Sequence, residues 1–441
     1  MTSSLITLRD YQQDAIGAVR TQYAQGAVAP LLVAPTGSGK TWMFVYIAQS
    51  AAARGRRALI LVHRGELLMQ TSRTLESLRV RHGLVAPGQS WTEAMVQVAS
   101  VQTLVRRLGR LGEQSRSGAP WVPDLIVVDE AHHATPKSGW GKVLRHWPDA
   151  RVLGVTATPE RLDGQGLGAE VGGFFDALVL GPTVRELVAR GFLSQPVVFA
   201  PSVVDVEGVK TKGGDFDRAG AAQRVDRPTI TGDAEVHYRK HLNGAPALAF
   251  CTTVAHAEHV AEGFRLAGWR AASLDGKLPE RERRQRIADL ANGELQLLAS
   301  CEIVSEGTDI PVVAGAVLLR HTQSLGLYLQ QVGRTLRPFP GKERAVILDH
   351  VGNVYRHGLP DEDRDWALDQ EKRSKRKKKR KEVGERRVKC LRCNAMHLPG
   401  PACPNCGFAY PEQRLIAFRE GELQEVDPGQ VRARMPALRK R

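Results

Sequence analysis

The sequence lacks any run of about 18 apolar residues, and this absence excludes a transmembrane helix. The first residues, Met1 to Leu5, lack the basic start and the long apolar stretch of a signal peptide. We therefore expect a cytoplasmic protein that makes no membrane contact. Its 441 residues are 42% apolar and 25% charged, a composition typical of soluble globular proteins, and they suffice for two or three domains.

Cysteine is scarce and unevenly distributed. Two of the six cysteines, Cys251 and Cys301, lie alone within apolar runs and are most simply small core residues. The other four form two Cys-x-x-Cys pairs near the C-terminus: Cys390, Cys393, Cys403 and Cys406. Four thiolates at this spacing predict a zinc ribbon, in which the Zn²⁺ is structural because no coordination position stays open. A redox-active or disulfide-bonded set is the alternative, which a reducing compartment disfavours.

Basic residues outnumber acidic residues, and most of the excess lies in one short stretch of the chain. The chain has a formal net charge of +15. Residues 372–389 alone hold twelve Lys and Arg against two Glu, a net of +10, so the remainder carries only +5. This concentration predicts a basic arm that binds a polyanion. The alternatives are a solvated linker without a partner and, for a eukaryotic source, a nuclear-import signal.

A Gly-rich segment after an apolar run has the pattern of a phosphate-binding loop. Gly37 and Gly39 would let backbone N–H groups surround phosphate oxygens at the start of a helix. Lys40 would reach the β- and γ-phosphates of ATP, and the Thr41 hydroxyl would bind Mg²⁺. The predicted nucleotide-binding residues here are Pro35, Thr36, Gly37, Ser38, Gly39, Lys40 and Thr41. A Gly-rich turn without a ligand is the alternative, since Ala34 stands where the usual pattern has its first Gly.

Upstream of this loop, Leu8 to Gln12 opens an amphipathic helical pattern. A Gln amide can donate and accept hydrogen bonds in one plane, as the edge of adenine requires. We therefore predict that Gln12, with Arg9 and Tyr11 nearby, lies on the adenine side of the nucleotide. For Gln12 taken alone, an ordinary polar helix residue is the alternative.

Two adjacent carboxylates follow a later apolar run. Residues 124–128 are predicted to form a buried strand of a parallel sheet, and they lead directly into Asp129 and Glu130. Such sheets bind ligands at the carboxyl ends of their strands. Asp129 would hold Mg²⁺ through water, and Glu130 would orient or deprotonate the attacking water. An exposed turn is the alternative, which the four apolar residues before the pair disfavour.

Three further segments, all C-terminal to the acid pair, also have the residue types of a nucleotide site or of a second domain. Thr156 to Pro159 follows another apolar run and is predicted to sense the nucleotide or to brace a second domain. A second α/β pattern starts at residue 245 and includes the segment 305–311. Beyond it, Arg334 and Arg337 stand three residues apart, a spacing that predicts one face of a helix.

Taken in order, these motifs resemble those of superfamily-two helicases of the DEAD/DEAH-like kind. The helical start and the Thr-Ala-Thr-Pro-x-Arg motif are closer to repair-type and restriction-type DNA helicases, including phage and bacterial ones, than to RNA-specific DEAD-box proteins. The resemblance implies an α/β fold of two tandem RecA-like domains with ATP and Mg²⁺ between them, and a nucleic-acid partner, DNA rather than RNA. It also implies that Arg334 and Arg337 reach the γ-phosphate, and that Gly307 and Asp309 couple the nucleotide to strand binding.

The predicted function is an ATP-dependent nucleic-acid motor, either a DNA helicase or a double-strand DNA translocase. An RNA helicase and the motor subunit of a restriction system share this chemistry, and a nucleic-acid-binding scaffold with residual ATPase activity is the alternative from another class. Replication, repair or restriction proteins are the expected partners.

The predicted boundaries are 1–197 for the N-terminal ATP-binding domain, 198–232 for a connector, 233–357 for the C-terminal helicase domain, 358–389 for a basic linker, 390–412 for the small zinc-binding module and 413–441 for a basic tail.

Overall fold

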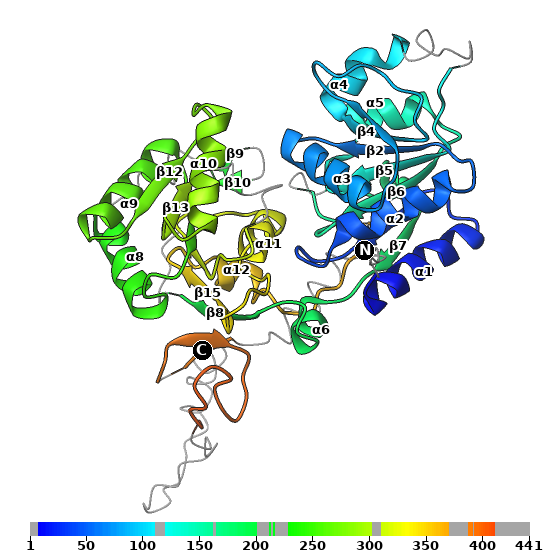
Figure 1. Cartoon of the computed structure of the whole chain (residues 1–441). Helices are drawn as coiled ribbons and strands as arrows, with labels where there is room; N and C mark the ends of the chain where they lie inside the picture. Colours follow the sequence, from blue (N-terminus) through cyan, green and yellow to red (C-terminus); the bar gives the residue numbers. More distant parts are fainter. Residues whose placement is uncertain are drawn as a thin grey trace, which may run out of the picture.

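The computed structural model describes residues 8–110, 120–161, 165–200, 211–212, 215–216, 228–301, 310–369, 387–390 and 392–410. Figure 1 shows two α/β lobes side by side, with a small C-terminal module beneath the second lobe. The predicted site residues Gly307 and Asp309, most of the basic stretch 372–389 and the tail 413–441 lie outside the described residues. Within those ranges, no helix is both long and apolar enough to cross a membrane.

The first lobe contains an all-parallel sheet, which has seven strands in the described part of the chain. Their spatial order is β3 (His82–Val85), β4 (Val96–Ser100), β2 (Ala58–Val62), β5 (Leu125–Asp129), β6 (Arg151–Thr156), β1 (Pro30–Val33) and β7 (Ala177–Leu180). The central strands are short apolar runs that are buried throughout, as expected of strands covered on both faces.

Helices cover both faces of this sheet. Because successive residues of a strand point to opposite faces, Ile60 packs in one core cluster while Leu59 and Leu61 pack in the other. On the Ile60 face lie α1 (Asp10–Ala24), α2 (Lys40–Ala52) and α3 (Gly65–Ser77), and on the opposite face lie α4 (Val101–Arg107) and α5 (Gly139–His146). Single 3₁₀ turns occur at η1 (Leu108–Arg110), η2 (Ala131–His133) and η3 (Ala169–Val171).

The second lobe contains a mostly parallel sheet. In the described residues its order is β12 (Ala271–Leu274), β13 (Leu297–Ser300), β11 (Ala247–Phe250), β14 (Gly315–Leu318), β15 (Arg344–Asp349), β8 (Gln195–Phe199), β17 (Ala395–His397) and β16 (Val388–Lys389). Its helices are α8 (Pro228–His241), α9 (Val254–Leu266), α10 (Glu280–Ala291), α11 (Leu325–Gly333) and α12 (Asn353–His357), and β9 (Thr211–Lys212) pairs separately with β10 (Asp215–Phe216). The predicted α/β class with two tandem domains is confirmed.

The chain crosses between the lobes earlier than the sequence predicts. Strand β8 pairs in parallel with β15 along its whole length, so it belongs to the second sheet. The boundary predicted at residue 197 falls inside this strand, and the predicted connector 198–232 begins after the crossing. The chain actually passes between the lobes in residues 181–194, here called the crossover, which contains α6 (Val184–Ala189) (Figure 1). A local apolar pattern identifies β8 as a strand but does not specify its partner.

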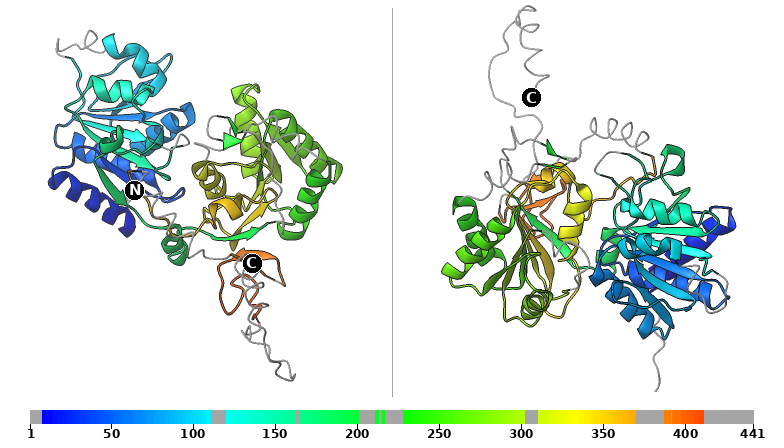
Figure 2. Two further views of the ribbon diagram at one scale, coloured as in Figure 1. Left: turned by 180° about the vertical axis from the view of Figure 1, so that it is seen from behind. Right: turned by 90° about the horizontal axis from the view of Figure 1, so that it is seen from above.

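Residues 358–369, predicted as the start of a basic linker, cross back to the first lobe and are here called the return segment. The N–H group of Leu167 in the first lobe donates to the carbonyl oxygen of Leu368 at 2.9 Å. Asp363 forms an ion pair with Arg185 of the crossover helix at 2.9 Å. Two neighbouring stretches of chain therefore join the lobes, which remain distinct bodies in the further views of Figure 2.

The C-terminal module extends the second sheet. Strand β17 pairs antiparallel with β8, with Ala395 opposite Phe199 and Met396 opposite Val198. The side chain of Arg344, at the start of β15, donates a hydrogen bond to the module's Asn405. Because β17 covers the outer edge of β8, the module protects backbone groups that would otherwise be an open sheet edge.

Candidate nucleotide site between the lobes

The predicted phosphate loop connects β1 to α2 and lines a cavity between the lobes. Gly37 and Gly39 have φ angles of +88° and +79°, a left-handed conformation that glycine adopts without steric cost. The Nζ atom of Lys40 donates to the carbonyl oxygens of Ala34 at 3.1 Å and Pro35 at 3.2 Å. The ammonium group of Lys40, the first residue of α2, therefore lies against the backbone at the start of the loop.

Side chains at the start of α1 also form hydrogen bonds with this loop. The Tyr11 hydroxyl and the Gln12 amide both donate to the carbonyl oxygen of Ser38, at 3.0 and 3.2 Å, and the amide oxygen of Gln12 accepts from the Arg9 N–H at 3.0 Å. An amide has two N–H donors and two acceptor lone pairs. Gln12 can therefore brace the loop and still offer a donor and an acceptor to a base, and it lines the cavity together with Arg9.

Asp129 and Glu130 lie at the carboxyl end of β5 and line the same cavity as Lys40. Glu130 has φ of +50° and ψ of 52°, a strained conformation for a residue other than glycine and one that gathers at functional sites. Burial raises the pKa of Asp129 and the adjacent Glu130 carboxylate adds to the rise, whereas Lys40 opposes it. A cation held beside Asp129 would stabilise its carboxylate form.

A chain of polar contacts links Glu130 to the Thr-Ala-Thr-Pro segment. One Glu130 carboxylate oxygen lies 3.4 Å from Nδ1 of His132, and that nitrogen lies 3.0 Å from the Thr156 hydroxyl. The Thr156 hydroxyl donates to the Thr158 carbonyl oxygen at 3.1 Å. A β carbon at Gly326 would lie 2.9 Å from the Thr158 hydroxyl, so Thr158 touches the start of α11 in the second lobe. The contact favours the bracing role predicted for this segment.

The second lobe completes the cavity. Gln330, Arg334 and Arg337 line it together with Lys40 and Glu130, and its volume of about 450 Å³ lies within the range of small-molecule sites. Arg334 is only 8% exposed. Burial lowers the pKa of Lys40, the two carboxylates oppose this shift, and the two guanidinium groups add to it. The predicted residues of the two lobes thus lie within electrostatic range of one another.

The two arginines do not share one helix face, contrary to the sequence prediction. Helix α11 ends at Gly333, Arg334 lies in the turn that follows, and Arg337 lies beyond that turn. Pro338 also disfavours a helical conformation at Arg337, the residue before it. A β carbon at Gly333 would lie 2.6 Å from the Cβ of Thr36, so the two lobes touch where the helix ends.

The sequence motifs missed several residues of the cavity wall. Gln70 and Thr74 project from α3 one turn apart, a polar pair on one helix face that was visible in the sequence. Phe192 comes from the crossover, where no local pattern marks it. Its presence follows only from the path of the chain between the lobes.

The four C-terminal cysteines form one compact cluster. The sulfur atoms of Cys390 and Cys406 lie 3.7 Å apart, as do those of Cys393 and Cys403, and all four lie within 4.8 Å of one another. Tetrahedral Zn²⁺ with Zn–S bonds of about 2.3 Å places its sulfurs roughly 3.8 Å apart. The cluster therefore fits zinc, while His397 is hydrogen-bonded to a tyrosine hydroxyl outside it.

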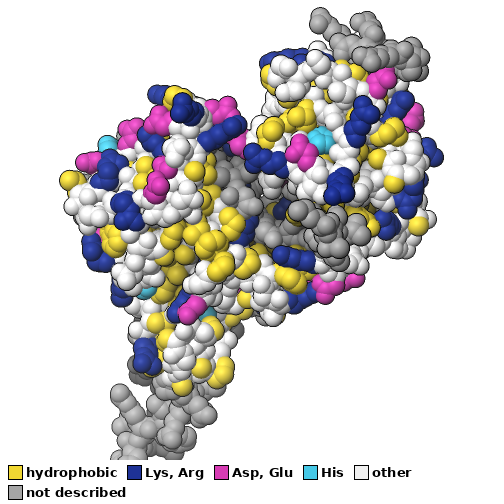
Figure 3. Space-filling view, viewed as in Figure 1, with side chains coloured by type: hydrophobic (Ala, Val, Ile, Leu, Met, Phe, Trp, Pro, Cys, Tyr) yellow, Lys and Arg dark blue, Asp and Glu magenta, His cyan; other side chains and the backbone are white. Residues whose placement is uncertain are grey.

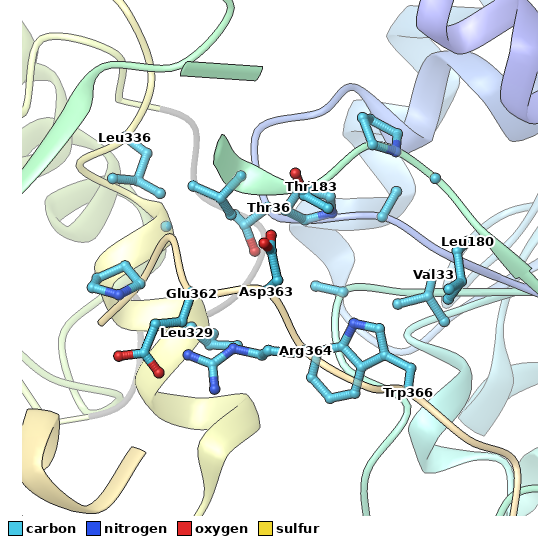
Figure 4. Close-up of a pocket in the computed structure, with 18 of the residues that line it drawn as sticks. Val33, Thr36, Leu180, Thr183, Leu329, Leu336, Glu362, Asp363, Arg364 and Trp366 are labelled. Atoms are coloured by element: carbon cyan, nitrogen blue, oxygen red, sulfur yellow. The ribbon is translucent and has the colours of Figure 1, made fainter. Parts of the chain in front are cut away.

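A second, smaller cavity is also lined by residues of both lobes (Figure 4). Its volume is about 100 Å³, and its wall includes Val33 before the phosphate loop, Leu329 of α11 and Trp366 of the return segment. The acidic side chain of Glu362 at its edge is paired with Arg387, next to the C-terminal module, at 2.6 Å. In Figure 3 a notch separates the two lobes, in agreement with cavities lined from both sides.

Two family models match the chain. "Type III restriction enzyme, res subunit" matches residues 5–161, and "Helicase conserved C-terminal domain" matches residues 233–338. The first range holds the phosphate loop, the acid pair and the Thr-Ala-Thr-Pro segment, and the second ends just after the two arginines.

The "51.5 kDa protein" of a Lactococcus phage (isolate 7-9) is 30% identical over 413 residues, which cover 93% of this chain and 85% of the phage protein. The chain belongs to the superfamily-two helicases. It is thus an ATP-hydrolysing nucleic-acid motor. The helicase is also 29% identical over 366 residues to "Putative ATP-dependent helicase IRC3" of Saccharomyces cerevisiae, and the match covers 78% of the helicase but only 51% of the yeast protein.

Solved structures share the architecture of this helicase. "The fragment structure of a putative HsdR subunit of a type I restriction enzyme from Vibrio vulnificus YJ016" superposes with a TM-score of 0.62 at 19% identity, over 80% of the helicase and 66% of that chain. At this identity the likeness concerns the fold alone. The fold is that of tandem RecA-like domains, as the order of motifs predicted.

Proposed function

We propose that this helicase binds Mg²⁺–ATP in the interlobe cavity and uses its hydrolysis to move along DNA, as a helicase or a double-strand translocase. One observation carries the proposal: Lys40, Asp129 and Glu130 of the first lobe meet Arg334 and Arg337 of the second lobe in one cavity. A site assembled from two bodies is complete only when they are closed, so nucleotide binding favours closure and product release favours opening.

The first lobe would supply the phosphate and metal contacts. Backbone N–H groups of the loop and the Lys40 ammonium would hold the β- and γ-phosphates. The Thr41 hydroxyl and Asp129 would hold Mg²⁺, which neutralises phosphate charge when it is bound. Glu130 would orient the attacking water and accept its proton, and its contact with His132 would keep the carboxylate aimed at the cavity.

The base would lie at the α1 end of the cavity. Gln12 would use its second donor and acceptor on the adenine edge, and the exposed guanidinium of Arg9 would lie against the ring. The support for this placement is that both side chains line the cavity and that Gln12 is hydrogen-bonded to Ser38 of the phosphate loop.

The second lobe would supply charge at the γ-phosphate through Arg334 and Arg337. Loss of that phosphate would remove the anion that these groups bind, and the lobes would separate. Gly307 and Asp309, outside the described residues, are proposed to couple this change to the bound strand.

A DNA substrate is supported by the restriction-enzyme model over residues 5–161 and by the Thr-Ala-Thr-Pro-x-Arg motif. The same model favours one second candidate, the motor subunit of a restriction system. The basic stretch 372–389, which lies between the return segment and the cysteine cluster, would add sequence-independent binding to the phosphate backbone through its net charge of +10.

The cysteine cluster is proposed to hold one structural Zn²⁺. We expect about one zinc ion per purified chain, and we expect Cys393→Ser to lose it. Because β17 pairs with β8, loss of the metal should also lower the unfolding temperature by several degrees, at roughly 2–4 °C per kcal/mol for a domain of this size. Zinc content and thermal unfolding are the measurements.

Cys301→Ser is the matched control for this experiment, since Cys301 lies in the second lobe outside the cluster. It should keep its zinc. A wild-type chain without zinc, or equal metal loss in both variants, would contradict the assignment.

The motor itself is tested by steady-state ATP hydrolysis without nucleic acid and with single-stranded DNA, duplex DNA, forked DNA or RNA, with Lys40→Ala as the inactive control. We expect at least one DNA form to stimulate hydrolysis strongly, and its identity separates a helicase from a duplex translocase. Stimulation by RNA alone would overturn the proposed substrate. No hydrolysis under any condition would refute the proposed motor activity.

A further inference from the structure

The second half of the crossover, residues 190–194, packs against the base end of the proposed nucleotide site. Arg190 forms an ion pair with Asp10, and its guanidinium lies 5.4 Å from the centre of the Tyr11 ring. Both partners are at the start of α1, beside the predicted base-contacting residues. The crossover therefore packs against α1, the helix whose first turn holds the predicted base-contacting residue Gln12.

Phe192 makes the central contact of this attachment. Its ring centre lies 4.5 Å from the guanidinium carbon of Arg9 and 5.1 Å from the ring centre of Tyr11. Arg9 also donates to the Tyr11 hydroxyl at 3.1 Å, and that hydroxyl donates to the carbonyl oxygen of Ser38 in the phosphate loop. A guanidinium is planar and stacks on aromatic rings, so Phe192 restricts the orientation of Arg9.

The same short segment also touches the phosphate loop and the arginine-bearing chain. A β carbon at Gly37 would lie 2.8 Å from the Leu193 side chain. The Ser194 N–H donates to the carbonyl oxygen of Leu336 at 2.6 Å, and its hydroxyl donates to that of Arg337 at 3.4 Å. Four of the five residues 190–194 thus contact the base end, the phosphate end or the second-lobe side of one cavity.

We propose that Phe192 is a positioning residue for base recognition, which holds Arg9 so that one face of its guanidinium stacks on the purine of ATP. The crossover connects this contact to the backbone beside Arg337, so a correctly stacked base favours the closed arrangement of the lobes. This inference rests on the proposed function, in which Arg9 and Gln12 contact adenine.

The test compares steady-state hydrolysis of ATP and UTP by the full chain, with the nucleic acid that stimulates it most. Phe192→Leu keeps an apolar side chain of similar size but removes the aromatic face. We expect it to raise KM for ATP by roughly three- to tenfold, to leave KM for UTP and both kcat values within about twofold, and so to weaken the preference for the purine. Phe192→Tyr should behave like the wild type.

Phe174→Leu is the matched control, because Phe174 is a half-buried phenylalanine of the first lobe that does not line the cavity. It should change neither KM. Equal rises in KM for ATP and UTP in Phe192→Leu, or a fall in kcat with KM unchanged, would show a merely structural role and overturn the inference.

Gln12→Ala distinguishes a failure of the role proposed for Phe192 from a failure of the proposed base site. If Gln12→Ala weakens the preference for ATP and Phe192→Leu does not, the inference fails while the proposed base site stands. If the wild type does not distinguish ATP from UTP and Gln12→Ala changes nothing, the proposed base site fails and the inference fails with it.

Discussion

Replacing Arg334 with alanine should lower the turnover number for ATP by roughly 10³–10⁵-fold, the range for an arginine that stabilises charge on a transferring phosphoryl group. Arg334 is buried at the end of α11 and enters the cavity from the lobe opposite Lys40. Its charge would act mainly on the transition state, so ATP binding should weaken far less than turnover. Single-turnover hydrolysis and the dissociation constant of a fluorescent ATP analogue measure the two effects.

Arg284→Ala is the control for this substitution. Arg284 lies in the same lobe on the exposed surface of α10, where it pairs with Glu280. Exposed pairs of this kind contribute little, so turnover should stay near the wild-type value. If Arg334→Ala keeps more than a tenth of wild-type turnover, the proposed role of the residue at the γ-phosphate is wrong.

Glu130→Gln should reduce ATP turnover by roughly 10²–10⁴-fold, the usual contribution of a general base. The amide keeps the shape of the carboxylate but cannot take a proton from water. ATP binding should be preserved, because the loop around Lys40 and the Thr41 hydroxyl are unchanged. Turnover in the presence of the stimulating nucleic acid, together with nucleotide affinity, is the measurement.

Glu66→Gln removes the same charge from the exposed first turn of α3 and is the matched control. It should leave turnover unchanged. Normal turnover in Glu130→Gln would reject Glu130 as the base. Loss of ATP binding in that variant would instead indicate that Glu130 holds the ligand or the local fold.

Two segments of chain, the crossover and the return segment, restrain the movement of the two lobes toward each other. The crossover contacts α1, the phosphate loop and the second lobe. In the return segment, the carbonyl oxygen of Leu368 accepts a hydrogen bond from the N–H group of Leu167. The return segment also reaches the C-terminal module through Glu362 and Arg387. Any change in the angle between the lobes must therefore be accommodated by both crossings.

Much of the first lobe's share of the site followed from the sequence, because each part is a contiguous segment with its own geometry. Gly37 and Gly39 occupy the left-handed conformation that the loop pattern required. The apolar run before Asp129 became a buried strand, and it placed both carboxylates at the ligand-binding edge of the sheet. The prediction for the second lobe was less accurate, since α11 ends at Gly333, Arg334 lies in the turn that follows, and Arg337 lies beyond that turn.

The sequence by itself determined the α/β class, the phosphate loop, the acid pair and the two cysteine pairs, because local spacing and strand burial specify them. Only the tertiary structure decided that β8 belongs to the second sheet, that the cysteine module extends this sheet, and that Phe192 lies against Arg9. Ser194 meets Arg337 across 143 residues of chain. Contacts of this kind depend on which distant surfaces fit together, and no local periodicity encodes that choice.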